Sequence, residues 1–159
     1  MLGGGWSVNP IAYSAATGAA TIPFESMGLG NWPELLLQIV GLQTGAGTPD
    51  YHIQFGVGGV YDTTNYVHYG ATGTTGLLFA TSVPAATSSG ALIELVHFNV
   101  AQQTWASRLS GGRENAATGA RTAIGLCTTA TAWDCLRISN STATNWTANG
   151  GVNIYGRQP

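Results

Sequence analysis

The segment Pro33-Glu34-Leu35-Leu36-Leu37-Gln38-Ile39-Val40-Gly41-Leu42 is the longest strongly apolar run of the chain. Leucine and glutamate form helices well, so a helix is the competing interpretation. The β-branched pair Ile39-Val40 and the glycine after it favour a strand instead. Because both faces of this strand are apolar, the pattern is typical of a strand that is covered on both sides.

A second apolar run, residues 91–98, shows the alternation of a strand. Its side chains divide between two faces, with Leu92, Glu94, Val96 and Phe98 on one and Ile93, Leu95 and His97 on the other. If Glu94 is buried there, it needs a partner such as Arg108 or Arg137. A two-layer sandwich requires apolar residues only on its inner faces. We therefore expect another subunit to cover the outer face of these strands.

Turn residues divide the rest of the chain at intervals of about eight to twelve residues, a spacing typical of an all-β sandwich or barrel. No amphipathic helical stretch of useful length appears. The expected strands cover residues 11–15, 19–24, 33–42, 51–57, 66–71, 77–82, 91–100, 104–109, 120–127, 133–139 and 152–155. The fold class that this predicts is an antiparallel β-sandwich.

The chain has 159 residues, which indicates one domain. We expect the sandwich to occupy residues 11–159, with residues 1–10 forming a Gly-rich amino-terminal arm. Trp6 in this arm is a candidate contact with a neighbouring protein, as are Glu94 and Phe98. The alternative for the arm is a frayed terminus.

Charged residues are unusually scarce, at 8% against a typical share of about 25%. The chain has no lysine, and its net charge of −2 gives no basic stripe for nucleic acid. The longest apolar run is about half the length that a membrane-spanning helix needs. The first residues lack the basic and apolar regions of a signal peptide. We therefore expect no nucleic-acid partner, no membrane partner and no classical secretion.

Chemistry-bearing residues do not form a recognisable catalytic or metal motif. His52, His68 and His97 are too widely spaced to indicate a metal site, and we predict no metal, cofactor or catalytic residue. A hydrolase that uses Glu94 or Glu114 is the weakest alternative. Cys127 and Cys135 could face each other across a hairpin, but in a reducing cytosol two free thiols are the expectation.

Aromatic residues allow a different hypothesis, a glycan-binding module. Tryptophan rings with neighbouring amides are suited to stacking against sugars and donating to their hydroxyls, and Asn145, Trp146 and Asn149 are the best candidate platform. Tyr66 and Tyr69 are a second choice. The competing interpretation is that these aromatic side chains fill the core and the subunit interfaces.

Five segments together resemble small virion proteins of tailed bacteriophages. They are Ala20-Thr21-Ile22-Pro23-Phe24, Pro33-Glu34-Leu35-Leu36-Leu37-Gln38-Ile39, Tyr51-His52-Ile53-Gln54-Phe55-Gly56, Asn65-Tyr66-Val67-His68-Tyr69-Gly70 and the closing stretch from Asn145 to Gly156. That family often carries an Asn-Gly-Asp step after the third strand. Residues 55–62 lack it here, so the resemblance implies no ligand or ion role for that loop.

The resemblance implies a jelly-roll-like sandwich, commonly trimeric, that serves as a capsid decoration protein or as a tail or fibre module. It implies no catalytic residue. We accordingly expect a non-enzymatic homotrimer, located in the virion and assembled in the host cytoplasm, that binds and stabilises the shell through the major capsid protein. The alternatives are a tail or fibre module and a glycan-binding receptor module.

Overall fold

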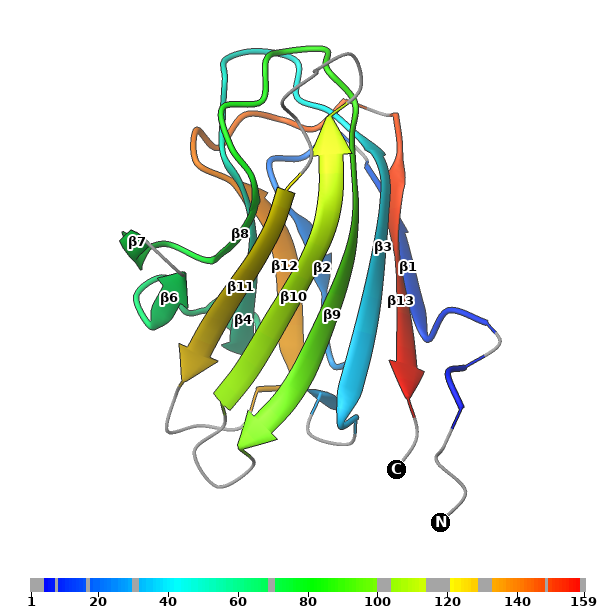
Figure 1. Ribbon diagram of the computed structural model, residues 1–159. Helices are drawn as coiled ribbons and strands as arrows, with labels where there is room; N and C mark the ends of the chain where they lie inside the picture. Colours follow the sequence, from blue (N-terminus) through cyan, green and yellow to red (C-terminus); the bar gives the residue numbers. More distant parts are fainter. Residues whose placement is uncertain are drawn as a thin grey trace.

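The computed structural model describes residues 5–7, 9–16, 18–29, 32–68, 71–99, 104–113, 121–128, 133–147 and 149–157. In these ranges the chain forms antiparallel strands arranged in two layers (Figure 1). The strands are β1 (Ala12–Ala15), β2 (Ile22–Phe24), β3 (Glu34–Leu42), β4 (Tyr51–Val57), β5 (Val60–Tyr61), β6 (Tyr66–His68), β7 (Ala71–Thr74), β8 (Leu77–Ala80), β9 (Ser89–Asn99), β10 (Thr104–Arg113), β11 (Arg121–Thr128), β12 (Cys135–Asn140) and β13 (Gly151–Arg157).

The large sheet has eight strands in the order β1-β13-β3-β9-β10-β11-β6-β7. The small sheet has the order β2-β12-β4-β5, and β8 also pairs with β4. Eight of these strands pair as mirror images along the chain: β1 with β13, β2 with β12, β3 with β9 and β4 with β8. An eight-stranded hairpin rolled up on itself has this pairing, which defines a jelly roll. The predicted fold class is therefore confirmed, with β10, β11, β6 and β7 added to the large sheet and β5 to the small sheet.

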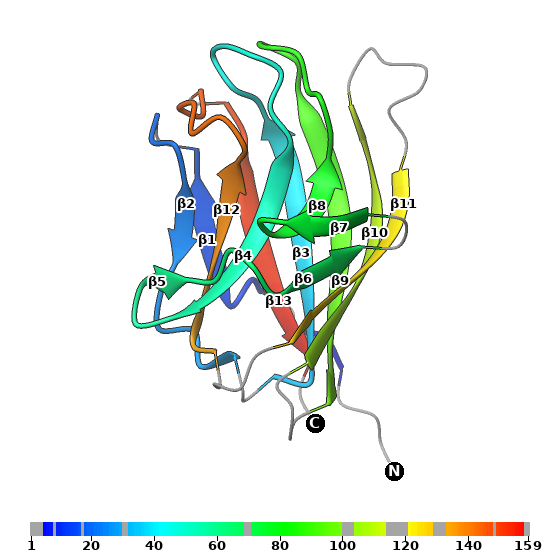
Figure 2. The same ribbon diagram turned by 90° about the vertical axis from the view of Figure 1, so that its left-hand side faces the viewer.

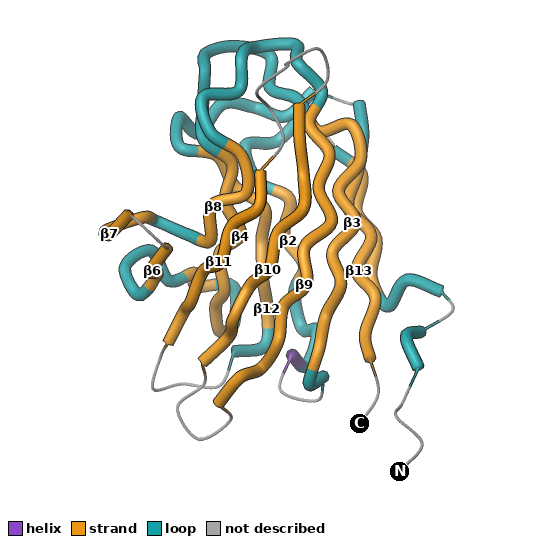
Figure 3. The backbone as a smooth tube through the Cα atoms, in the orientation of Figure 1, coloured by secondary structure: helices purple, strands orange, loops and turns teal. Residues whose placement is uncertain are grey.

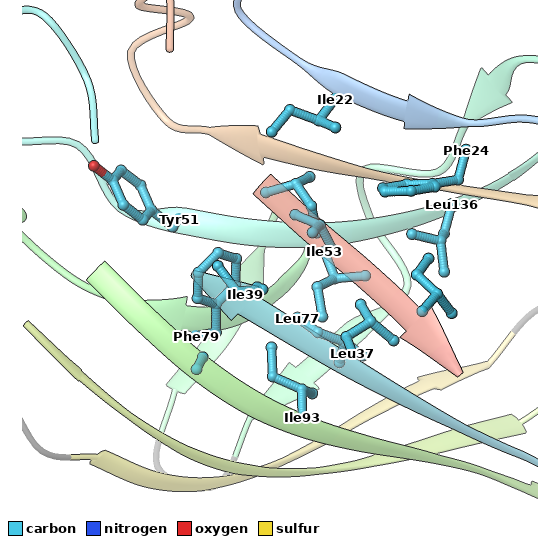
Figure 4. Close-up of a cluster of buried hydrophobic side chains, with 14 of the residues drawn as sticks. Ile22, Phe24, Leu37, Ile39, Tyr51, Ile53, Leu77, Phe79, Ile93 and Leu136 are labelled. Atoms are coloured by element: carbon cyan, nitrogen blue, oxygen red, sulfur yellow. The ribbon is translucent and has the colours of Figure 1, made fainter. Parts of the chain in front are cut away.

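The core lies between the two sheets (Figure 4). The large sheet contributes Leu37, Ile39 and Ile93, and the small sheet contributes Ile53 and Leu136, all of them buried. Each such aliphatic side chain contributes about 1.5–3 kcal/mol by leaving water. This single layer of apolar contacts holds the sandwich together.

Residues 34–42 form a strand, as predicted, and not a helix. Leu35, Leu37 and Ile39 point into the core, whereas Gln38 and Val40 are exposed on the opposite face. Within the single chain the outer face of this strand is therefore uncovered, and its cover by another subunit stays a prediction. The pairing of β3 with β9 is irregular after Ile39, close to where β3 ends.

Two glycines permit the close approach of β3 and β13 at this point. Gly41 and Gly150 both have positive φ, of 66° and 94°. A Cβ on Gly150 would lie 2.3 Å from the Val40 carbonyl oxygen, which leaves no room for a side chain. The backbone conformation and the packing both require glycine here.

The edge of β4 that faces away from β12 pairs with several partners. Residues 51–53 pair with β8 and residues 56–57 pair with β5. Between them, the Phe55 N–H donates to the hydroxyl of the buried Tyr66, at 2.8 Å. Tyr66 belongs to β6 of the large sheet, so this hydrogen bond ties the two sheets together at one side. Figure 2 shows β6 and β7 running across the direction of the neighbouring strands on that side.

Long loops gather at one end of the sandwich (Figure 3). The loop after β3 meets the loop after β8 through Val83 N–H to Pro49 carbonyl and Ala86 N–H to Thr44 carbonyl, both 2.9 Å. The Asp50 carboxylate accepts the Ser82 N–H at 2.7 Å, and the Asp50 carbonyl accepts the Ser141 N–H at 2.9 Å. The three loops are thus joined by hydrogen bonds into one cap.

The described part of the amino-terminal arm pairs with its own chain. Trp6 forms an antiparallel bridge with Arg157, and the Ser7 N–H donates to the Gly156 carbonyl at 2.9 Å. These residues extend the edge of the large sheet beside β13. The frayed-terminus alternative is therefore wrong for residues 6 and 7, because both pair with the backbone at the edge of the large sheet.

Each predicted strand has a counterpart, with boundaries that differ by a few residues. The structure adds β5, and it divides the predicted strand at residues 66–71 between β6 and β7. The hairpin proposed for the cysteines is wrong. Cys127 lies on β11 of the large sheet and Cys135 on β12 of the small sheet, so the two strands do not pair. The Cys135 thiol is free and buried.

Candidate functional site

The outer face of the large sheet carries the largest group of exposed aliphatic side chains among the described strands. Val40 on β3 is 53% exposed, and Leu92 and Val96 on β9 are 46% and 39% exposed. Leu36 beside them is half-buried. We call these four residues the aliphatic zigzag, because the register places each of them diagonally from the next, in the order Val96, Leu36, Leu92, Val40. Diagonal neighbours on a sheet face are within reach of one another.

The polar side chains that border the zigzag on the β13 side are paired within the chain. The Arg157 guanidinium lies 2.9 Å from the Glu34 carboxylate. Gln38 accepts hydrogen bonds from Asn153 Nδ2 at 3.3 Å and from the Tyr155 hydroxyl at 3.4 Å. Exposed pairs of this kind contribute at most about 1 kcal/mol, so they orient the face more than they stabilise it.

Glu94 and Arg108 occupy directly opposite positions on β9 and β10. Both side chains are exposed, because this side of β9 faces away from the core, so the burial that would require a partner for Glu94 does not occur within the subunit. Of its two predicted partners, Arg108 is the neighbour, and Arg137 lies in the other sheet. Among the described residues the one ion pair joins Arg157 to Glu34, and Glu94 and Arg108 make none.

The other predicted contact residues lie at the margins of this face. Trp6 is exposed beside β13. Phe98 lies on β9, but its side chain is outside the described part of the structure. Val40 and Leu92, which the structure exposes, were missed as individual residues. The signal for them was present in the alternation of their strands, which puts each of them opposite the core residues.

The predicted glycan platform does not hold together. Trp146 is only 1% exposed, and its ring packs edge-on against Tyr51 with 4.7 Å between the ring centroids. Asn145 and Asn149 are exposed beside it. A buried ring offers no face to a sugar, so Trp146 is a core residue. The second predicted platform, Tyr66 and Tyr69, is not supported either. Tyr66 is also buried, and Tyr69 is outside the described residues.

The outer face of the small sheet is a polar network. The Arg137 Nε donates to the side-chain oxygen of Gln54 at 2.7 Å, and Gln54 Nε2 donates to the Thr75 carbonyl. The Arg137 guanidinium also lies over the Tyr61 ring, 4.3 Å from its centroid. Sequence reasoning missed this network, because its members are far apart along the chain.

Ionisation in this network is suppressed. Burial, reinforced by the nearby Cys135 thiol and Glu25 carboxylate and opposed by Arg137, raises the pKa of Tyr61 to about 12. Burial also raises the pKa of the Cys135 thiol. A thiol that stays protonated is a poor nucleophile, so this network is suited to holding the face together rather than to chemistry.

The described residues contain no group of three or more histidine, cysteine, aspartate or glutamate side chains placed to hold a metal ion. His52 is buried on β4, the His68 side chain lies outside the described residues, and burial lowers the pKa of His97. Glu114, named for the hydrolase alternative, also lies outside them. In the described segments no helix is long and apolar enough to span a membrane.

Comparisons with family models, with curated proteins and with solved structures found no match to this chain. The function is therefore inferred from the sequence and the geometry of this chain, and the outer face of the large sheet is the strongest candidate site.

Proposed function

We propose that this chain is a non-enzymatic structural protein of a tailed-phage virion, a homotrimeric capsid decoration protein that binds and stabilises the shell. The observation that carries the proposal is the aliphatic zigzag on the outer face of the large sheet. Interfaces of permanent oligomers are more apolar than ordinary protein surface. A sheet face with four aliphatic side chains fits that description.

Composition supports the same proposal. A chain with 8% charged residues and no lysine has few surface charges, so little charge repulsion opposes its association with other protein surfaces. A subunit that lies within a particle needs less charge, because much of its surface contacts protein. The resemblance to small virion proteins and the jelly-roll pairing agree with such a role.

Stabilisation of the shell would follow from binding alone. A protein that binds the assembled lattice and not its free subunits shifts the assembly equilibrium towards the lattice by mass action. A trimer would add multivalency, because three linked contacts raise the effective concentration of each one. No catalytic residue is needed for this function.

Absolute mass by light scattering tests the proposed self-assembly. We expect the purified chain to have three times its 16.4 kDa mass, with little dependence on salt. Leu92→Lys, which places a charge in the zigzag, should yield monomers. The matched control is Val60→Lys, because Val60 is 77% exposed on β5, away from the large sheet. A monomeric wild type, or a trimer that is unaffected by Leu92→Lys, would contradict the proposal.

Location on the particle needs a second experiment. Immunogold labelling of purified virus particles with an antibody against the chain should decorate the whole shell. Label confined to the tail would support the alternative of a tail or fibre module. Particles that lack the chain should release their DNA at a lower temperature, and addition of the purified protein should restore the wild-type temperature. Absence of the chain from particles would overturn the assignment to a virion.

A further inference from the structure

We infer that the symmetry axis of the homo-oligomer runs along the strands between β9 and β10, and that Glu94 of each subunit pairs with Arg108 of the next. This inference rests on the self-assembly in the proposed function and specifies its geometry. It concerns a charge arrangement that the aliphatic zigzag alone does not predict.

Glu94 and Arg108 are cross-strand neighbours at the centre of the large sheet, because β9 and β10 are the fourth and fifth strands in its order of eight (Figure 1). Both side chains are exposed on the outer face. The line between these strands divides the sheet into two halves of four strands.

A second pair of opposite charges on the same face, Glu34 and Arg157, differs from Glu94 and Arg108. Glu34 and Arg157 are also cross-strand neighbours, and their side chains form an ion pair at 2.9 Å. Glu94 and Arg108 have the same chemistry and the same kind of register, yet among the described residues they form no ion pair. Their charged groups therefore remain available to groups outside the subunit.

A second copy of this chain is the partner that fits this face. A cyclic axis that runs over the line between β9 and β10 brings β9 of one subunit against β10 of the next. Each Glu94 then meets an Arg108, and opposite charges alternate around the axis in a dimer or a trimer alike. The charges on this face are thus complementary to the same face of another copy.

The surroundings strengthen such a pair. Leu36 is directly opposite Glu94 on β3, and Leu92 and Val96 lie two residues away on either side of it. When these aliphatic side chains are covered by the neighbouring subunit, water is excluded from around the charges. The Coulomb attraction between the two charges is then stronger than at an open surface. Removal of one partner is also costly, because the other charge is left buried and unpaired.

Charge reversal tests the inference, with oligomer mass by light scattering as the readout. Glu94→Arg alone and Arg108→Glu alone should each place like charges around the axis and weaken the subunit affinity by more than about tenfold. The double variant Glu94→Arg/Arg108→Glu should restore the wild-type mass. Glu94→Gln, a milder change that keeps the shape, should weaken assembly less than Glu94→Arg.

The matched control is Glu34→Gln, which removes a charge of the existing intrachain pair on the same face and should leave the mass unchanged. Circular dichroism establishes that each variant is folded. A wild-type trimer that persists in both single reversals, or a double variant that fails to reassemble, overturns this inference and leaves the proposed function standing. A monomeric wild type overturns both.

Discussion

The two outer faces of the sandwich differ in how far their polar side chains are buried and paired within the subunit. On the small sheet, Gln54 is buried and joined to Arg137 and to the backbone at Thr75. On the large sheet, Gln38 is exposed, and Glu94 and Arg108 face outward without an ion pair between them. The polar network on the small sheet is complete within the subunit, whereas the centre of the large sheet leaves two charges and a group of aliphatic side chains to be covered.

This difference separates two kinds of contribution. A side chain on the small sheet's outer face should matter for the stability of the single chain and little for assembly. A side chain of the aliphatic zigzag, or Glu94 or Arg108 on the same face, should do the reverse. The same residue type on the two faces therefore gives a direct test, with the free energy of unfolding as one measurement and the oligomer mass as the other.

The largest difference is expected for the two glutamines. Gln54→Ala leaves the Arg137 Nε–H without its acceptor and opens a small cavity, so it should reduce the free energy of unfolding by about 2–3 kcal/mol. Gln38→Ala should cost under about 0.5 kcal/mol, because water replaces its exposed hydrogen bonds. Urea unfolding of both variants measures the difference, and equal losses would show that the two faces are not distinct.

Gly76 and Gly90 differ in the same way, in the space that each leaves for a side chain. A Cβ on Gly76 would lie 2.8 Å from the His52 Cβ and from the Ile53 carbonyl oxygen, so Gly76→Ala should destabilise the chain by about 1–3 kcal/mol. Gly90 lies on the outer face of β9, where a Cβ has its nearest contact at 3.4 Å. Gly90→Ala should therefore change the melting temperature little. A smaller loss for Gly76→Ala than for Gly90→Ala would contradict this account.

The smallest effect concerns alkaline pH. The pKa of Tyr61 is raised to about 12, so its neutral form is favoured in the folded state. In the unfolded chain tyrosine ionises near pH 10, and stability is therefore lost as the pH rises from about 10 towards 12. Tyr61→Phe should show less of this loss between pH 8 and pH 10.5 in urea unfolding. Tyr13→Phe, exposed on the large sheet, is the matched control, and identical pH profiles for Tyr61→Phe and the wild type would rule out this linkage.

Local sequence patterns were sufficient for the fold class. The strand at residues 34–42 follows from the β-branched pair Ile39-Val40 and from Gly41, and β4 has the predicted boundaries. β5 could not be predicted, because two residues, Val60 and Tyr61, are too few to show a period. The separation of Cys127 from Cys135 also escaped prediction, since local sequence does not reveal a connection that crosses from one sheet to the other.

The candidate site was predicted only in part. Glu94 and its neighbour Arg108 were identified, but their exposure was not, because an apolar strand does not by itself tell which of its faces is covered. Trp146 was misjudged for a related reason. Its neighbours in the sequence are polar loop residues, and only the arrangement of the loops places its ring against Tyr51 in the core.

The mirror-image pairing of the strands also has a consequence for the time course of folding. β1 near the start of the chain pairs with β13 near its end, and β2 pairs with β12, so most of the sheet contacts join distant parts of the sequence. Chains dominated by such contacts fold in milliseconds to seconds rather than microseconds. During synthesis β1 stays unpaired until β13 has left the ribosome, and β3 has no partner until β9 has been made. The nascent chain therefore exposes the edge of β3 for longer than any local hairpin would, and that interval is when aggregation competes with folding.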